Sequence, residues 1–165
     1  MNKFAGRHLI FDGTTRNTEK LCSTEYITDY MYKVTELLDM TLVYPPIVAK
    51  FPFSGEISKF TKKLKGEGVD CLTLRQMEEC LKGRDNNGGV SAISVWLESH
   101  IAIHTWTEDN YISLDLFSCK DYDSDIVIDF TSKYFNLNYL SVMDIERYMG
   151  NVQLPRYLEF KLENI

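Results

Sequence analysis

The sequence predicts one α+β domain over residues 1–165: a two-layer sandwich in which two helices pack on one face of a mainly antiparallel sheet. Three observations lead to this fold class. The length, with 44% hydrophobic and 25% charged residues, is ordinary for a single globular domain. Between residues 90 and 118, three β-rich segments are joined by short connections, which is typical of an antiparallel meander. Two amphipathic segments lie before and after that meander, and each needs a sheet face to cover.

The first half of the chain is predicted to contain two strands and one long helix. His8–Asp12 is a short apolar run and forms the first strand. After a polar turn at Asn17–Cys22, Ser23 caps a helix over Thr24–Met40, where apolar residues recur at helical spacing. Thr41–Tyr44 favours a strand, but two prolines follow it, so we expect it at a sheet edge or before a bend.

Residues 50–88 have a different character, because they are richer in charge and glycine. Two short helices are expected there, over Glu56–Lys65 and Leu72–Lys82, and the run Gly83–Gly89 indicates a loop. We interpret this region as an insertion between strands. The alternative is an ordinary helical part of the core.

The second half of the chain returns to strands, with one more amphipathic helix and a final tail. The predicted strands are Val90–Leu97, His100–Trp106, Tyr111–Ser118 and Asn138–Tyr148, the helix is Ser124–Tyr134, and the tail is Gln153–Ile165. The strand over Tyr111–Ser118 alternates clearly, with aliphatic residues on one face and polar or aromatic residues on the other.

Charge and cysteine usage exclude several classes of protein. The net charge of −6 argues against a sequence-independent nucleic-acid binder, and the apolar runs are too short to cross a membrane. No secretion signal is apparent. The cysteines show neither a CxxC pair nor zinc spacing, so we expect no metal site and reduced thiols in a cytoplasmic protein. These cysteines are Cys22, Cys71, Cys80 and Cys119.

A serine, two histidines and a cysteine are expected near one another in the meander. Ser99 lies between two strands, and His100 and His104 share one face of the strand that follows it. Cys119 ends the next strand, which folds back beside Ser99. We therefore expect serine, histidine and cysteine to converge at one end of the sheet. The alternative is that each has an ordinary structural role.

The segment Gly89–Glu108, followed by Asp115–Cys119, resembles the prokaryotic-type S-adenosylmethionine decarboxylase proenzymes. The signature of that family contains the motifs GVS, ESH, IHTWPE and D-hydrophobic-F-[ST]-C. Gly6–Leu9 also matches the family's opening GRHL. The resemblance implies a pyruvoyl-dependent decarboxylase of spermidine biosynthesis. It also implies self-cleavage between Glu98 and Ser99, giving a β chain of residues 1–98 and an α chain of residues 99–165.

The implied chemistry answers a physical need, since decarboxylation of an amino acid requires an electron sink that side chains do not offer. The resemblance implies that Ser99 attacks the Glu98 carbonyl and finally becomes a covalently bound pyruvoyl group, which forms a Schiff base with the substrate. His104 would remove the Ser99 α-proton during processing, assisted by Ser91. Cys119 would be the proton donor during decarboxylation.

The resemblance also implies substrate-binding residues and partners. Glu108 would accept hydrogen bonds from ribose hydroxyls, and Asp12 would face the sulfonium or amine, with His100 as a third substrate-binding residue. The processed α and β chains would assemble as a homodimer, packed sheet to sheet, with pockets lined by both protomers.

Three departures from the family pattern bear on the substrate. Thr107 replaces a proline, and Lys120 replaces a glycine. The stretch Asp85–Gly88 lacks the aromatic residue on which the family stacks adenine. Aromatic residues that could replace it are Phe51, Phe53 and Phe60.

Three functions therefore stay open from the sequence. The first is S-adenosylmethionine decarboxylase. The second is a pyruvoyl-dependent decarboxylase of the same fold that acts on ornithine or arginine, which the missing aromatic favours and the retained Glu108 disfavours. The third is a non-catalytic regulatory subunit, which would have no reason to keep Ser91, Ser99, His104 and Cys119 together.

Overall fold

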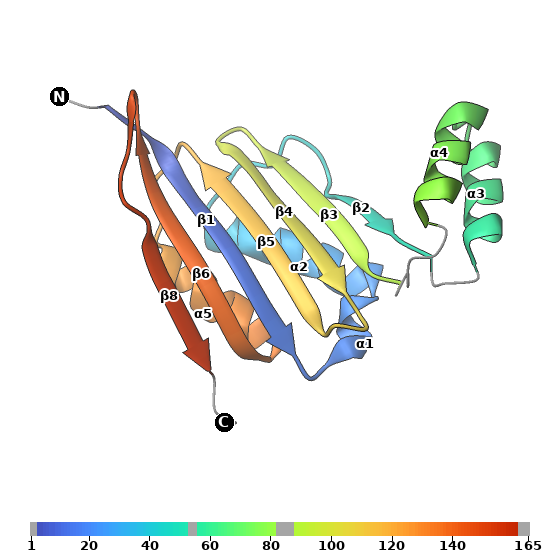
Figure 1. The fold of residues 1–165 in the computed structure, drawn as a ribbon. Helices are drawn as coiled ribbons and strands as arrows, with labels where there is room; N and C mark the ends of the chain where they lie inside the picture. Colours follow the sequence, from blue (N-terminus) through green and yellow to red (C-terminus); the bar gives the residue numbers. More distant parts are fainter. Residues whose placement is uncertain (1–2, 53–55, 82–87, 162–165) are drawn as a thin grey trace.

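The computed structural model describes residues 3–52, 56–81 and 88–161, and these form one antiparallel sheet with helices on one face (Figure 1). The strand order is β2-β3-β4-β5-β1-β6-β7, and β8 also pairs with β6. The strands are β1 (Phe4–Thr15), β2 (Ile47–Lys50), β3 (Val90–Trp96), β4 (Ser99–Trp106), β5 (Tyr111–Ser118), β6 (Leu137–Tyr148), β7 (Asn151–Val152) and β8 (Arg156–Lys161). The helices are α1 (Thr18–Leu21), α2 (Thr24–Leu37), α3 (Ile57–Gly66), α4 (Cys71–Leu81) and α5 (Ser124–Phe135).

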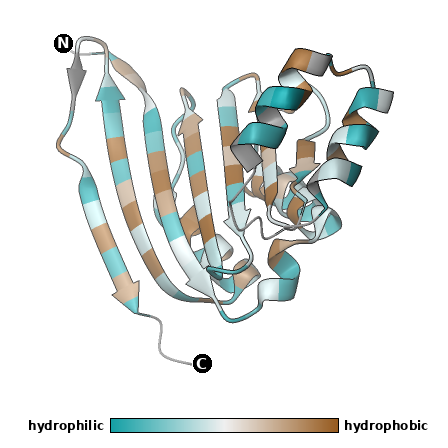
Figure 2. Cartoon of the chain, turned by 45° about the vertical axis from the view of Figure 1, so that its right-hand side comes forward, coloured by the Kyte–Doolittle hydropathy of each residue, from teal (hydrophilic) through white to brown (hydrophobic). Residues whose placement is uncertain are grey.

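The core lies between the sheet and helices α2 and α5. Alternate residues of each central strand are apolar, as the banding of the strands shows (Figure 2), and these face the helices. Phe11 of β1 and Leu114 of β5 are almost fully buried there. The two helices also contact each other, because the Tyr30 hydroxyl lies 2.8 Å from the Thr131 hydroxyl inside the core. Burial of this face makes the strand register unambiguous, since a slip of one residue would expose every core side chain.

The predicted meander, both long helices and strand β6 are confirmed, with small differences at their ends. Ser23 caps α2 as expected, accepting a hydrogen bond from the Tyr26 backbone N–H. The α+β class is therefore correct. The first strand is longer than predicted, because it pairs with β6 along its whole length from Phe4 to Thr15.

Three local predictions were wrong, and the sheet consequently has eight strands instead of about six. Part of the expected turn Asn17–Cys22 forms the short helix α1. Thr41–Tyr44 contributes only an isolated bridge from Leu42 to Trp96; the edge strand β2 starts after the prolines, which cannot donate ladder hydrogen bonds. The supposed tail forms β8, which pairs with β6.

Strand β8 is held by a network of ion pairs as well as by its ladder. The buried Asp144 carboxylate lies 3.2 Å from Arg156 of β8 and 3.2 Å from Arg7 of β1. Arg156 also pairs with Asp125 of α5 at 2.7 Å. Removing either arginine would leave Asp144 less completely paired in a buried position, which is costly.

Helices α3 and α4 form a hairpin beside the sheet, on the β2 side (Figure 1). Thr61 is buried between them and donates a hydrogen bond to Glu78 at 2.7 Å. Both helices were expected within two residues of their observed ends; that the region is an insertion stays a prediction. Within the described part of the chain, no helix is long and apolar enough to span a membrane.

Candidate functional site

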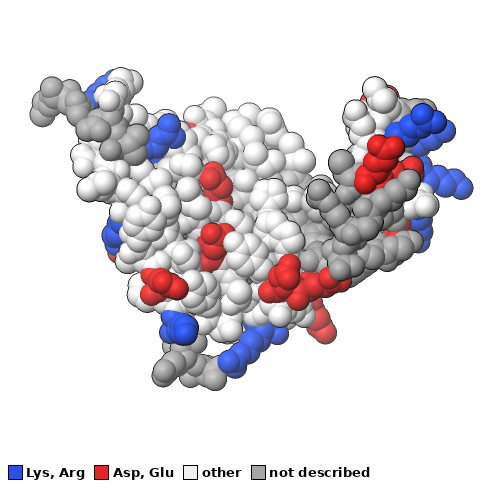
Figure 3. Space-filling view, in the orientation of Figure 1, with Lys and Arg blue, Asp and Glu red and all other residues white. Residues whose placement is uncertain are grey.

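Most of the candidate residues lie on the sheet face that no helix covers, and the others lie at the ends of its strands. In the same orientation as Figure 1, this open face is mostly uncharged, with separate acidic groups over its central strands (Figure 3). Aligned polar residues from five strands form a row across it, since Ser91, His104, Ser113, Asp12 and Ser141 are register partners in turn. The open face therefore carries the chemistry, and the other face carries the core.

Five residues, which we call the Ser99 cluster, lie at one end of the β4–β5 hairpin: Ser99, His100, Cys119, Asp115 and His8. The Ser99 hydroxyl lies 3.2 Å from His100 Nδ1. His100 Nε2 lies 3.3 Å from one oxygen of Asp115, whose other oxygen lies 2.8 Å from His8 Nε2. Ser99 and Ser118 are register partners, so the prediction that Cys119 lies near Ser99 is confirmed.

The peptide link between Glu98 and Ser99 is held from both sides. The Glu98 carbonyl oxygen accepts a hydrogen bond of 3.0 Å from the Cys119 backbone N–H. The Glu98 carboxylate accepts hydrogen bonds from the backbone N–H and hydroxyl of Thr41, at 3.0 and 3.1 Å. The Thr41 backbone hydrogen bond holds the pKa of this exposed carboxyl below its usual range. Ser99 itself has a φ of 153°, which non-glycine residues rarely adopt.

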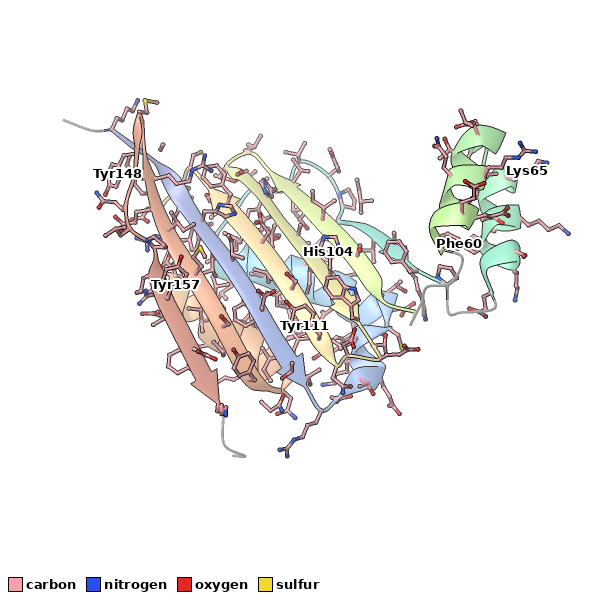
Figure 4. All side chains as sticks on the ribbon, in the orientation of Figure 1. Phe60, Lys65, His104, Tyr111, Tyr148 and Tyr157 are labelled. Carbon is pink, nitrogen blue, oxygen red and sulfur yellow. The ribbon has the colours of Figure 1, made fainter. Side chains whose placement is uncertain are left out.

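A second group, the Ser91 cluster, lies further along the same face: Ser91, His104, Trp106, Tyr111 and Asp12. The Ser91 hydroxyl lies 2.7 Å from His104 Nδ1. Tyr111 donates a hydrogen bond of 2.5 Å to Asp12; burial first, and Asp12 second, raise the pKa of Tyr111 to about 12. The Trp106 ring contacts both His104 and Tyr111, and the latter two are labelled in Figure 4.

The two clusters do not meet within one chain, so the expected convergence of serine, histidine and cysteine holds for Ser99, His100 and Cys119 but not for His104. His104 is paired with Ser91 and Ser113, five positions along β4 from Ser99. At about 3.4 Å per residue, that separation is about 17 Å. Both residues belong to β4, so the rise of that one strand keeps His104 away from Ser99 whatever the strand register.

The three predicted substrate-binding residues are likewise divided. His100 lies beside Ser99, whereas Asp12 belongs to the Ser91 cluster. Glu108 is exposed in the turn between β4 and β5, at the opposite end of β4 from Ser99. Asp12 is not at a strand end, because β1 continues to Thr15.

His8 and Asp115 were not predicted to belong to the Ser99 cluster. Both lie in segments that match the family motifs, but β1 and β5 are about a hundred residues apart in the chain, and their pairing cannot be read from local pattern. Alternation in β5 did place Asp115 on the same face as Phe117, and that signal would have sufficed once the β1–β5 register was known.

The departures from the family pattern occupy defined positions. Lys120 binds the loop after α2, with its ammonium 3.0 Å from an Asp39 carboxylate oxygen. Phe51 follows β2, and its N–H donates to the Gly89 carbonyl at 2.8 Å; Ala49, two residues earlier, pairs with Ser91. Phe60 lies on α3, away from the sheet (Figure 4). Asp85–Asn87 and Phe53 lie outside the described residues.

Comparison with known proteins places the chain in a family. The family model described as S-adenosylmethionine decarboxylase matches residues 59–148, more than half of the chain. A solved structure, the adenosylmethionine decarboxylase from Aquifex aeolicus VF5, matches with a TM-score of 0.59 and 17% identity, covering 88% of this chain and 92% of that one. That likeness supports the fold.

Curated relatives extend the match over most of the length. The S-adenosylmethionine decarboxylase proenzyme of Clostridium botulinum strain Loch Maree is 29% identical over 146 residues, 88% of this chain and 96% of the relative. The proenzyme of strain Hall is 30% identical over 118 residues, 72% of each chain. The chain belongs to the S-adenosylmethionine decarboxylase family.

Proposed function

We propose that this protein is a proenzyme of S-adenosylmethionine decarboxylase that cleaves itself between Glu98 and Ser99 and uses the pyruvoyl group derived from Ser99. The observation that carries the proposal is the geometry at this peptide link. A hydroxyl nucleophile is next to an imidazole, and the carbonyl that it would attack accepts a backbone hydrogen bond. The curated relatives are proenzymes, and self-cleavage of a proenzyme needs a nucleophile beside the carbonyl that it attacks.

The surroundings of Ser99 fit a pyruvoyl group. Ser99 is half-buried at the end of β4, and its hydroxyl lies 3.2 Å from Nδ1 of His100, which is on the face that the helices leave free. A bound pyruvoyl carbonyl supplies the electron sink for the carbanion left when CO₂ departs.

Cys119 has the position of a proton donor in this reaction. It is exposed, and its backbone is hydrogen-bonded to the residue before Ser99, so the thiol belongs to the same end of the sheet. A thiol can return a proton to the substrate Cα at neutral pH, since its ordinary pKa is near that range.

Two measurements test this function. Intact mass should reveal two chains, residues 1–98 and 99–165, in the wild type and one full-length chain in Ser99→Ala. The cleaved protein should then release CO₂ from S-adenosylmethionine and not from ornithine or arginine. Full-length wild-type chain after prolonged incubation would refute self-cleavage, and release from a basic amino acid alone would replace the substrate.

We further propose that the working site is formed by two protomers, packed open face to open face across a two-fold axis. Ser91 and His104 are about 17 Å from Ser99 in one chain, too far to act on it. In an isologous dimer, residue i of one protomer meets j of the other and the reverse, so each Ser99 cluster can face the partner's Ser91 cluster. Exposed apolar side chains on this face, such as Ile93 at 37% and Trp106 at 39%, support such burial.

The substrate-binding carboxylates then come from the partner as well. Asp12 and Glu108 lie with the Ser91 cluster or near it, so they would approach a substrate bound at the other protomer's Ser99. Carboxylates suit this substrate, because its sulfonium is cationic and its ribose hydroxyls are hydrogen-bond donors.

Complementation between two inactive chains tests the shared site. Ser99→Ala retains the Ser91 cluster, and His104→Ala retains the Ser99 cluster. When both are co-expressed, the mixed dimer contains one complete site, and only the His104→Ala chain should be cut. If each chain stays intact in mixed dimers as it does alone, the shared site is wrong.

A further inference from the structure

The Ser99 hydroxyl must lose its proton when it attacks the Glu98 carbonyl, and the Ser91 cluster lies too far away in the same chain to accept it. A titratable group within hydrogen-bond distance is the adjacent His100, whose Nδ1 lies 3.2 Å from the Ser99 hydroxyl. His100 is half-exposed on the open face of β4. It therefore touches the reacting atom before any partner approaches.

The proton positions on His100 follow from its other neighbour. Asp115 is a carboxylate and accepts hydrogen bonds without donating any. One of its oxygens lies 3.3 Å from His100 Nε2, and the other lies 2.8 Å from His8 Nε2. A neutral His100 with its proton on Nε2 presents that proton to the carboxylate and leaves the lone pair of Nδ1 for Ser99.

Phe117 keeps the rings of His100 and His8 in place. It is the register partner of both His100 and His8, and its ring contacts theirs at centroid distances of 6.4 and 5.9 Å. On the strand after next, Arg147 covers the Phe117 ring at 4.7 Å. Gly6 has a φ of +149°, and a Cβ there would lie 2.7 Å from the Phe117 ring, so only glycine leaves the ring undisturbed.

The attacked carbonyl is also prepared for the reaction. The Cys119 N–H, 3.0 Å from the Glu98 oxygen, is positioned to stabilise negative charge that develops there. The positive φ of Ser99 adds backbone strain at the bond to be broken. Nucleophile, base, orienting carboxylate and oxyanion donor are thus all supplied by one chain.

We propose that His100 is the general base of the first processing step, the acyl shift, and that Asp115 and His8 are its positioning residues. This inference rests on the proposed self-cleavage. The Ser99 Oγ–H proton passes to His100 Nδ1 while Oγ bonds to the Glu98 carbonyl carbon. The bond from that carbon to the Ser99 nitrogen then breaks, and the nitrogen takes the proton from Nδ1. The amide becomes an ester, and no proton is gained or lost.

The two histidines of β4 then act in different steps of processing. His100 serves ester formation in its own chain, whereas His104 serves the later removal of the Ser99 α-proton. Hydroxylamine distinguishes these steps, because it cleaves an ester at neutral pH and leaves an amide intact. The rate of hydroxylamine-dependent cleavage therefore reports how fast the ester forms.

The test uses full-length precursor of His104→Gln, which should be cut by hydroxylamine after Glu98. Adding His100→Gln should slow that cleavage about 100-fold or more, the usual contribution of a general base. Adding Ser113→Ala, on the open face of β5 two residues from Asp115, is the matched control and should leave the rate unchanged. Equal rates with and without His100→Gln would overturn the proposal.

A second comparison guards against a variant that simply folds badly. In His100→Ala on the same background, added imidazole should restore hydroxylamine-dependent cleavage, which a misfolded chain would not permit. Absence of rescue, in a chain whose circular dichroism and unfolding temperature match the parent, would count against the proposal.

The positioning role of Asp115 has its own signature. Asp115→Asn should slow ester formation about 10-fold or more when His100 is present, since the wrong tautomer is then allowed. It should add nothing in His100→Ala rescued by imidazole, because the free base needs no orienting. Additive effects would overturn the positioning role. Wild type that never cleaves would instead refute the proposed function itself.

Discussion

The two faces of the sheet are built from the same strands but have opposite character. The helix-covered face is apolar, and its side chains, such as Phe11, Ile103 and Leu114, are almost fully buried. The open face carries hydroxyls, imidazoles and carboxylates that contact one another in pairs across neighbouring strands. Because side chains alternate, residues 113, 114 and 115 of β5 lie in turn on the open face, on the covered face and again on the open face.

The difference between the two faces shows that the packing of the core positions the site residues, although these residues are not part of the core. The register that buries Leu114 is the register that places Asp115 between two histidines. Substitutions in the Ser99 and Ser91 clusters should therefore change processing or turnover while the fold persists, and substitutions on the covered face should lower stability.

The largest expected effect is at Ser99. Ser99→Ala removes the attacking hydroxyl, so cleavage and CO₂ release should both be lost completely, while far-ultraviolet circular dichroism stays that of the folded precursor. Intact mass measures the first effect directly. Two fragments from Ser99→Ala would mean that the chain is cut by a different route.

Cys119 should separate turnover from processing on the same face. Cys119→Ala leaves the Cys119 backbone N–H in place, so the chain should still be cut, but kcat should fall about 100-fold or more through loss of the proton donor. Quantified fragments and CO₂ release from one preparation give both readouts. A processed Cys119→Ala with wild-type kcat would exclude the thiol as that donor.

Leu114 and Ser113 are neighbours on β5 but lie on opposite faces of the sheet, so their substitution should affect the free energy of unfolding differently. In the uncut Ser99→Ala background, Leu114→Ala should lower the free energy of unfolding by about 3 kcal/mol, as for other buried leucines. Ser113→Ala, on the open face, should change it by less than about 0.5 kcal/mol. Urea unfolding of the two variants measures the difference. Similar losses would show that the open face is packed as a core.

Phe51 offers the smallest and sharpest test, because it lies at the edge of the open face near the Ser91 cluster. It is 40% exposed, and its hydrogen bond to Gly89 fixes it beside the strand that carries Ser91. If it replaces the aromatic platform for adenine, Phe51→Ala should raise KM for S-adenosylmethionine about 10-fold with kcat retained. Phe60→Ala is the matched control on α3, and an equal KM in both variants would exclude Phe51 from this role.

Much of the fold could be predicted from the sequence because the signals were local. The strand over Tyr111–Ser118 was found with both ends correct, since alternation and short turns define it. Strand β8 was missed because it is short and mostly exposed. It is stabilised by its pairing with β6 and by the ion pair between Arg156 and Asp144 of that strand, which no local pattern reveals. Strand β2 was displaced because β-propensity at Thr41–Tyr44 was outweighed by two prolines and by the ladder with β3.

The candidate site was predictable in its members more than in its arrangement. Ser99, His104 and Cys119 were identified from motifs. Strand rise alone keeps His104 away from Ser99, and that distance followed from the predicted strand over His100–Trp106. The contacts that link Ser99 to His8 through His100 and Asp115 depend on the pairing of β1 with β5. That pairing is a long-range contact that no local pattern encodes.

The strand order has a consequence for the protein after cleavage. Residues 1–98 would contribute β1, β2 and β3, and residues 99–165 would contribute β4, β5 and β6, yet β1 lies between β5 and β6. The two fragments are thus interleaved, and their ladders hold them together without a covalent link. Separating them would require the sheet to be dismantled. Refolding of the cut protein would then be a bimolecular search, so denaturation that is reversible for the precursor becomes dependent on concentration for the mature form.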